Sequence, residues 1–154
     1  MVDVRAARAA DAEAMSAILL PILAGWGSDR PGGPAYVLAH YIEHPDRVAC
    51  TVAMDAAGEM LGFQSLKAAR PGNPYGLPEG WGIIGTYVRA SAGRRGVGKA
   101  LFAASLRAAK AAGLAEIDAT IGAGNAQGLA YYEALGFRSY REKPGAVCKK
   151  LVVG

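Results

Sequence analysis

Three glycines and two arginines stand together at residues 93–98, in the run Gly-Arg-Arg-Gly-Val-Gly. Apolar residues then recur at helical spacing as far as Gly113, so this run predicts a turn that leads into a helix. The start of a helix presents free backbone N–H groups and the positive end of the helix dipole, and both favour an anion. Glycines let the backbone approach a phosphate closely, while Arg94, Arg95 and Lys99 supply positive charge. We therefore interpret this loop as a phosphate-binding site.

Other phosphate-binding patterns fit the loop less well. Gly93 to Lys99 matches the front of a P-loop, G-x-x-x-x-G-K, but Ala100 stands where a Ser or Thr must hold magnesium. A dinucleotide fingerprint needs a third glycine, and Leu101 occupies that position. A nucleotide-binding protein of the P-loop kind remains an alternative. A bare cationic turn is a second one, although cations are unfavourable at the start of a helix.

A second conspicuous segment follows a predicted strand at 115–120 and begins at Asn125, a residue suited to start a helix. It contains Tyr132 and ends at Gly136, which is suited to stop one, followed by Phe137. The segment before the glycine-rich loop, 83–88, is rich in β-branched and aromatic residues and predicts a mostly covered strand.

The two segments together resemble the GCN5-related N-acetyltransferases (GNAT). In that family the acetyl-CoA loop reads Gln/Arg-x-x-Gly-x-Gly/Ala after a strand, and a later segment reads Asn-x-x-Ala/Ser-x-x-x-Tyr-x-x-x-Gly-Phe. The sequence departs from these patterns at Gly93, in place of Gln or Arg, and at Gly128, in place of Ala or Ser. The residues that match or flank the two patterns are Gly96, Val97, Gly98, Ala100, Leu101, Asn125, Tyr132, Gly136 and Phe137.

The resemblance implies direct transfer of acetyl from acetyl-CoA to the amine of a small molecule. It implies that Tyr87 and Val88 offer backbone groups to the pantetheine arm, and that Tyr132 donates a proton or a hydrogen bond to the departing thiolate. Glu79 is our candidate for the base, because it lies just ahead of the fourth strand. A non-catalytic acyl-CoA-binding module of the same fold is the main alternative. The residues expected to hold the cofactor are Tyr87, Val88, Gly93, Arg94, Arg95, Gly96, Val97, Gly98, Lys99, Ala100 and Asn125.

Composition excludes several other classes of protein. The 154 residues suit one domain, 1–154, and 52% hydrophobic with 19% charged residues is typical of a globular protein. The net charge of +4, without interleaved aromatic residues, does not favour nucleic acid. No apolar run approaches the length of a membrane span and no signal peptide is visible, so we expect a cytoplasmic protein. Cys50, Cys148, His40 and His44 lack metal-ligand spacing, and no metal is expected.

The fold that we expect is a single α/β domain of the GNAT type. Its mixed, mostly antiparallel and twisted sheet has about seven strands and about four helices, and is split near strands four and five. We expect acetyl-CoA in the split, and a homodimer is a possible assembly. A helix is predicted to begin at Pro34 and to stop before Pro45, and a long loop is predicted at 68–80. The predicted strands are 2–6, 48–54, 60–67, 83–88, 115–120, 137–141 and 146–152.

Overall fold

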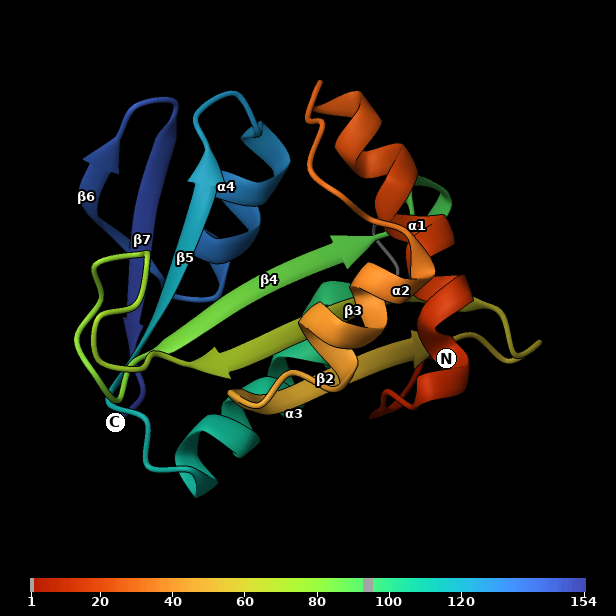
Figure 1. Cartoon of the computed structure of the whole chain (residues 1–154), viewed down its shortest axis with the longest axis horizontal. Coiled ribbons are helices and arrows are strands. Elements are labelled where there is room, and N and C mark those ends of the chain that lie inside the picture. The colour runs from red at the N-terminus through yellow and green to blue at the C-terminus, as the bar shows by residue number, and fades with distance from the viewer. Residues whose placement is uncertain (1, 93–95) are drawn as a thin grey trace.

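A single sheet forms the centre of the protein. The computed structural model describes residues 2–92 and 96–154, and within these ranges seven strands lie in the order β1-β2-β3-β4-β5-β7-β6 (Figure 1). Neighbouring strands are antiparallel except β4 and β5, which confirms the predicted mixed sheet. The strands are β1 (Asp3–Ala6), β2 (Arg47–Met54), β3 (Met60–Ala68), β4 (Gly82–Val88), β5 (Glu116–Gly122), β6 (Arg138–Lys143) and β7 (Ala146–Val152).

The sheet divides between β4 and β5. These parallel strands pair only at Gly82 with Ile117 and at Ile83 with Asp118, and beyond these pairs they diverge (Figure 1). β4 remains paired with β3 along its whole length. Beyond Ile83, therefore, no described strand pairs with the β5-facing edge of β4, and the predicted split between strands four and five is confirmed.

Helices cover both faces of the sheet. α1 (Ala12–Gly25) and α2 (Pro34–Val37) lie on the near face in Figure 1, and α3 (Val97–Ala111) lies behind it. α4 (Ala126–Ala134) packs through Tyr132 into the core that α3 shares with β4 and β5. Gly113, with φ of +72°, follows the end of α3 as predicted. The largest side chains of the near-face core are Met15, Leu19, Tyr41, Phe63 and Tyr87, and those of the far-face core are Leu66, Phe102, Ile117, Tyr132 and Phe137.

The helix predicted from Pro34 differs from a regular α-helix. α2 covers only Pro34–Val37 and continues as a π-helical turn, Leu38–Ile42. The backbone N–H of Glu43 donates to the carbonyl of Leu38, five residues back, at 2.8 Å, and this longer bond widens the turn. Tyr41 projects from the turn into the near-face core.

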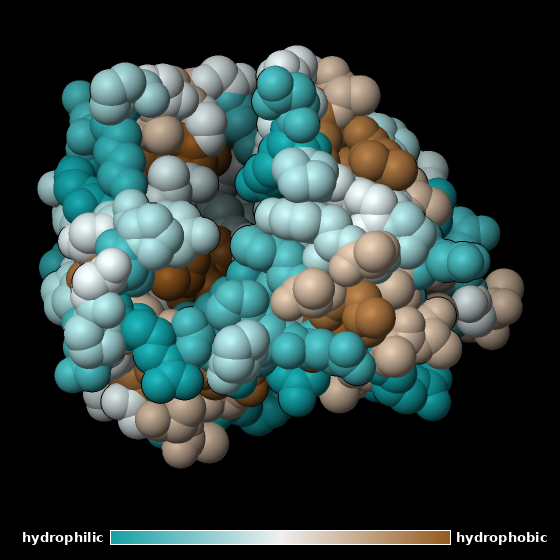
Figure 2. All heavy atoms as spheres, viewed as in Figure 1, coloured by the Kyte–Doolittle hydropathy of each residue, from teal (hydrophilic) through white to brown (hydrophobic). Residues whose placement is uncertain are grey.

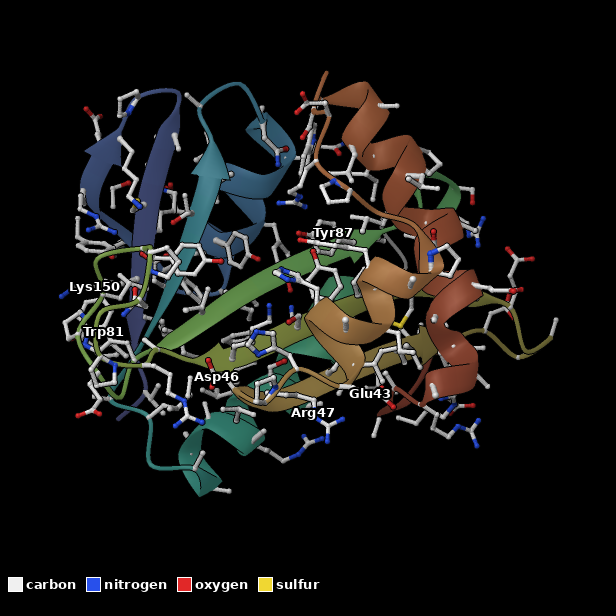
Figure 3. The ribbon with its side chains drawn as sticks, viewed as in Figure 1. Glu43, Asp46, Arg47, Trp81, Tyr87 and Lys150 are labelled. Atoms are coloured by element: carbon white, nitrogen blue, oxygen red, sulfur yellow. The ribbon has the colours of Figure 1, made fainter. Side chains whose placement is uncertain are left out.

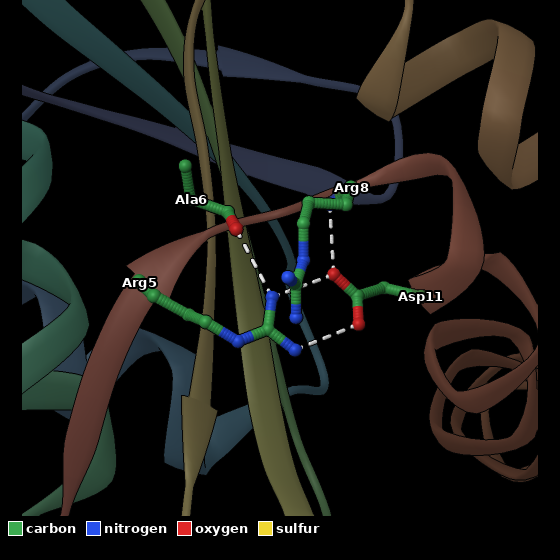
Figure 4. A network of polar contacts seen from close by, with 4 residues as sticks. All are labelled: Arg5, Ala6, Arg8 and Asp11. Carbon is green, nitrogen blue, oxygen red and sulfur yellow. Dashed lines mark hydrogen bonds and ion pairs between the residues drawn. The ribbon is translucent and has the colours of Figure 1, made fainter.

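An ion pair joins the end of β1 to the start of α1. The guanidinium of Arg5 donates to both carboxylate oxygens of Asp11, at 2.8 and 2.9 Å (Figure 4). The backbone N–H of Arg8 donates to the same carboxylate at 2.7 Å. Because these bonds favour the ionised form, they lower the pKa of Asp11. The pair thus ties the end of β1 to the turn that leads into α1.

The long loop between β3 and β4 is ordered around Asn73. Its side-chain oxygen accepts the backbone N–H groups of Tyr75 and Leu77, both at 3.1 Å, and its amide donates to the carbonyls of Arg70 and Leu77, both at 2.8 Å. Arg141 of β6 donates to the carbonyl of Tyr75 at 3.0 Å. The loop therefore lies against the β6 side of the molecule.

Candidate functional site

A cavity of about 400 Å³ lies at the N-terminal end of α3, beside the C-terminal end of β4. Five of the predicted cofactor residues meet there, although they belong to β4, to the turn before α3 and to α3 itself. Small and apolar side chains supply most of the rest of the lining. The lining residues are Val88, Ala92, Gly96, Val97, Gly98, Lys99, Tyr131, Ala134 and Leu135.

Gly96 and Gly98 of the loop are glycines for different structural reasons. Gly96 has φ of +75°, a left-handed conformation that side chains other than glycine adopt at a cost, and a Cβ there would meet no other atom within 4 Å. A Cβ on Gly98 would lie 2.5 Å from Cε1 of Tyr131. The ring of Tyr131 therefore leaves room only for glycine at position 98. The hydroxyl of Tyr131 donates to the Gly98 carbonyl at 2.7 Å.

The start of α3 offers backbone donors to the cavity. The first bond between successive turns there is from the N–H of Ala100 to the carbonyl of Gly96, at 3.0 Å. The N–H groups of Val97–Lys99 precede it and have no acceptor within the helix. They are suited to an anion, and the exposed Lys99 adds positive charge. The predicted ligands Gly93, Arg94 and Arg95 lie outside the described residues.

A buried polar network joins the cavity to the split in the sheet. The side-chain amide of Gln64 on β3 donates to Thr86 on β4, at 2.9 Å, and to the hydroxyl of Tyr131, at 3.1 Å. Ser105 of α3 donates to the other end of Gln64. The hydroxyls of Thr86 and Tyr132 are 2.7 Å apart. Four elements therefore hold the hydroxyl of Tyr132 at one position.

Tyr132 is buried and remains protonated at neutral pH. Its ring packs against Tyr131 and Phe137, with centroids 4.9 and 5.1 Å away. Burial raises its pKa, because the phenolate would lose its hydration, and the hydrogen bond with Thr86 only partly opposes this effect. Burial likewise raises the pKa of Tyr131 to about 12.

Sequence reasoning missed the partners of Tyr132. Gln64, Thr86 and Tyr131 carry no recognisable motif, and they come from three separate elements. One signal was available: Gln64 is a fully buried polar residue within the apolar run Met-Leu-Gly-Phe-Gln-Ser-Leu. A buried amide requires hydrogen-bond partners, so its position pointed to a network on this strand.

The backbone of β4 faces two directions. The N–H group of Ala69 donates to the carbonyl of Trp81, and that of Arg89 donates to the carbonyl of Leu61. Along an antiparallel pair of strands, hydrogen-bonded residue pairs alternate with pairs that are not hydrogen-bonded to each other. The backbone groups of Tyr87 consequently face β3, opposite Phe63, while those of Thr86 and Val88 face the split. Val88 is thus suited to the predicted backbone contact with the cofactor. The backbone groups of Tyr87 are used in the pairing with β3, so Thr86 is better oriented than Tyr87 for the second backbone contact.

Asn125 occupies the N-cap of α4. Its side-chain oxygen accepts the N–H of Gly128 at 3.0 Å, so it caps the helix as its position in the sequence predicts. A Cβ on Gly128 would lie 2.5 Å from Nδ2 of Asn125, which explains why glycine stands there in this chain. Asn125 is not among the residues that line the cavity.

Glu79 lies apart from the other predicted catalytic residue. It is exposed, on the loop just before Trp81. Figure 3 shows Trp81 and Lys150 at one end of β4 and Tyr87 near the other. The structure therefore does not bring Glu79 to Thr86 and Tyr132, and its role as a base stays a prediction.

The near face of the split carries a separate group of side chains. Tyr87 projects there from β4, and its hydroxyl accepts a hydrogen bond from Arg30 at 2.9 Å. Figure 2 shows a hollow on this face, between the part of the molecule that carries α1 and α2 and the part built on β5, β6 and β7. Brown, hydrophobic atoms lie on the left side of this hollow in the view, and teal, hydrophilic atoms lie on its right side. The β4 strand thus separates two sites of different character.

Comparisons with known proteins agree with this geometry. The family model described as the acetyltransferase (GNAT) family matches residues 15–137. That is well over half of the chain, and the protein therefore belongs to the GNAT acetyltransferase family. No curated protein sequence matches the chain significantly.

Solved structures share the whole fold at low sequence identity. A GCN5-related N-acetyltransferase from Kribbella flavida is 23% identical, with 98% of this chain and 97% of that chain covered and a TM-score of 0.83. A phosphinothricin acetyltransferase of the GNAT superfamily from Sinorhizobium meliloti, in complex with AcCoA, is 22% identical, with 99% and 89% covered and a TM-score of 0.83. Ribosomal-protein-alanine N-acetyltransferase from Brucella melitensis is 19% identical, with 97% and 99% covered and a TM-score of 0.72. These likenesses confirm the predicted fold.

The two cysteines, Cys50 and Cys148, are free and buried. In the described part of the chain, no helix has the length and the apolar character that crossing a membrane requires.

Proposed function

We propose that the protein is an acetyl-CoA-dependent N-acetyltransferase that moves acetyl from the thioester to the amine of a small molecule by direct attack. One observation carries this proposal. The cavity at the N-terminal end of α3 extends to Tyr131, whose ring packs against the buried phenol of Tyr132 beside the split in the sheet. The cavity that suits a phosphate and the phenol that we propose as the donor therefore lie on either side of the Tyr131 ring.

The lining of the cavity suits the parts of acetyl-CoA. The N–H groups of Val97–Lys99, which have no acceptor within α3, and the charge of Lys99 favour its pyrophosphate. Val88, Ala134 and Leu135 offer apolar contacts, and the backbone groups of β4 that face the split can bond amides as a further strand would. When bound, acetyl-CoA supplies the acetyl thioester. The complex of the Sinorhizobium meliloti relative with AcCoA supports this choice of ligand.

Tyr132 is our candidate for the group that donates to the departing sulfur. Thr86 has one hydroxyl hydrogen and two lone pairs, and one lone pair accepts the amide of Gln64. Thr86 can therefore donate its hydrogen to Tyr132, which leaves the phenolic hydrogen free for another acceptor. Because burial keeps the phenol protonated, that hydrogen is present at neutral pH.

The attacking amine must be neutral, so a proton has to leave it. The seven residues of β4, Gly-Ile-Ile-Gly-Thr-Tyr-Val, include no acidic side chain. Since Glu79 lies near the opposite end of β4, our prediction that it is the base requires a chain of water molecules along the hollow. Solvent water is the simplest alternative acceptor for the proton.

A thiol-release assay tests the proposed function. The purified protein is incubated with acetyl-CoA and a panel of small amines; free thiol is followed continuously, and acetylated products are identified by mass spectrometry. We expect saturable release that depends on the amine. Tight binding of acetyl-CoA in calorimetry with no release for any amine would indicate a non-catalytic acyl-CoA-binding module. Stabilisation by magnesium and ATP but not by acetyl-CoA would indicate a nucleotide-binding protein.

A pair of glycine variants tests where acetyl-CoA binds. Gly96 and Gly58 both have positive φ, +75° and +83°, and neither has an atom within 4 Å of a built Cβ. Valine at either position therefore carries a similar backbone strain, but Gly58 lies in the turn between β2 and β3, away from the cavity. We expect Gly96→Val to raise the Kd of acetyl-CoA at least about tenfold, a loss of about 1.4 kcal/mol. Gly58→Val should leave Kd unchanged, and equal Kd values for both variants would refute the placement.

A further inference from the structure

Two cations and two tyrosines meet on the near face of β4, across the strand from the α3 cavity. The guanidinium of Arg30 donates to the hydroxyl of Tyr87 at 2.9 Å and lies 5.9 Å from the centre of its ring. The hydroxyl of Tyr41 donates to the same oxygen at 3.4 Å. The ammonium of Lys67 lies 5.2 Å from the centre of the Tyr41 ring. Arg30 and Lys67 thus flank the pair of tyrosines.

The positive charge of this cluster is not balanced. Among the described residues, neither Arg30 nor Lys67 has a carboxylate within ion-pair distance. The carboxylate that acts on Lys67 most strongly belongs to Asp46, which is already paired with Arg70. Burial and the charge of Arg30 lower the pKa of Lys67 to about 8. An anion between the two cations would relieve this repulsion.

The cluster also presents hydrogen-bond donors without acceptors. A guanidinium carries five N–H groups, and within the described part of the chain only one group of Arg30, on Nη2, has an acceptor. The oxygen of Tyr87 accepts from both Arg30 and Tyr41, and its own hydrogen has no acceptor among the described residues. Arg30 is exposed, so a small molecule can reach it. The planar fork of an arginine matches the two oxygens of a carboxylate.

The position of the cluster connects it with acetyl transfer. Tyr87 stands between Thr86, which contacts Tyr132, and Val88, which lines the α3 cavity. Successive side chains of a strand point to opposite faces, so a molecule bound at Tyr87 lies across one strand from the proposed donor site. Beyond Ile83 no described strand pairs with the β5-facing edge of β4, so the backbone groups of this edge at Thr86 and Val88 are not used in the sheet at this level. An amine bound at the cluster would therefore lie next to the unpaired edge of β4, along which the thioester is proposed to bind.

We propose that Arg30, Lys67 and the hydroxyl of Tyr87 bind a carboxylate of the acceptor, so that the substrate is an amine that also carries a negative charge, such as an amino acid. This inference rests on the proposed acetyltransferase function. The cofactor's own phosphates are a poorer match, because the donors of α3 that suit them open on the other face of the sheet.

Matched pairs of acceptors test this inference. Each amino acid in the thiol-release assay is compared with its carboxamide and with the corresponding decarboxylated amine. We expect the wild-type protein to prefer the amino acid. In Arg30→Gln, kcat/KM for the amino acid should fall about 10–100-fold, the range for charge-assisted hydrogen bonds, and that for the carboxamide should change less than about threefold. Lys67→Met, which keeps the contact with Tyr41, should show the same selectivity with a smaller loss.

Two controls separate the possible outcomes. Arg107→Gln removes an exposed arginine from α3, on the opposite face, and should leave both rates unchanged. The Kd of acetyl-CoA should be equal in Arg30→Gln and in the wild type, and the amino acid should raise the melting temperature of the wild type more than that of the variant. Transfer to neutral amines with no preference for the carboxylate would overturn the carboxylate site and leave the acetyltransferase function intact. A weakened Kd for acetyl-CoA in Arg30→Gln would assign Arg30 to the cofactor instead.

Discussion

Replacing Tyr132 with phenylalanine removes one hydroxyl and leaves the packed ring. The ring keeps its contacts with Tyr131 and Phe137, and Thr86 keeps its bond from Gln64, so only the 2.7 Å contact is lost. The free energy of unfolding should fall by about 0.5–1.5 kcal/mol, the usual net contribution of one hydrogen bond. A protein of this size tolerates such a loss and remains folded.

The effect on catalysis should be larger than the effect on stability. A donor to the departing sulfur acts mainly in the transition state, so kcat should fall while the Kd of acetyl-CoA stays nearly constant. General acid catalysis contributes about 10²–10⁴-fold, and because thiolates leave fairly well unprotonated we expect the lower end of that range or somewhat less. Since burial raises the pKa of Tyr132, the wild-type kcat should show no loss from its ionisation between pH 7 and 10.

The neighbouring Tyr131 provides the matched control. Tyr131→Phe also removes one buried hydroxyl, with bonds to the Gly98 carbonyl and to Gln64 at 2.7 and 3.1 Å, and should cost at least as much stability. Its kcat at saturating acetyl-CoA should stay within about threefold of wild type. The measurements are initial rates of thiol release, calorimetry with acetyl-CoA and urea unfolding for each variant. A kcat for Tyr132→Phe within about twofold of wild type would show that Tyr132 serves packing alone and does not donate to the departing sulfur.

Two further predictions concern packing and pH. In Gly98→Ala the new Cβ lies 2.5 Å from the ring of Tyr131, and this overpacking should lower the free energy of unfolding, measured in urea, by about 1–3 kcal/mol. Adding Tyr131→Leu should restore most of the lost stability, and a double variant that is no more stable than Gly98→Ala would refute this contact. Burial lowers the pKa of His40 to about 4 from an ordinary 6.5, so the unfolded chain binds more protons and stability should fall as the pH drops from 6.5 to 4. In His40→Phe the melting temperature should fall less over this range, and an unchanged slope would contradict the assignment.

The sequence by itself determined the elements whose signals are local. The apolar spacing of α3, the glycine stops at Gly113 and Gly136, and the runs of β-branched and aromatic residues such as 83–88 depend on residues a few positions apart. Propensity, capping and periodicity act over that same distance, so they predicted seven strands and the glycine-rich start of α3. The π-helical turn at Leu38–Ile42 was missed, because helical spacing does not reveal one additional residue in a turn.

Only the tertiary structure decided which side chains share a site. The bonds from Gln64 to Thr86 and Tyr131 and from Thr86 to Tyr132 join residues 22, 67 and 46 positions apart, and their meeting depends on strand register and on how α4 packs. Glu79 shows the converse. It precedes β4 directly, yet a strand of seven residues at about 3.3 Å each separates its two ends by roughly 20 Å. Proximity in the sequence therefore predicts the element on which a residue lies, whereas the packing of the sheet decides which end of that element, and which face, its side chain occupies.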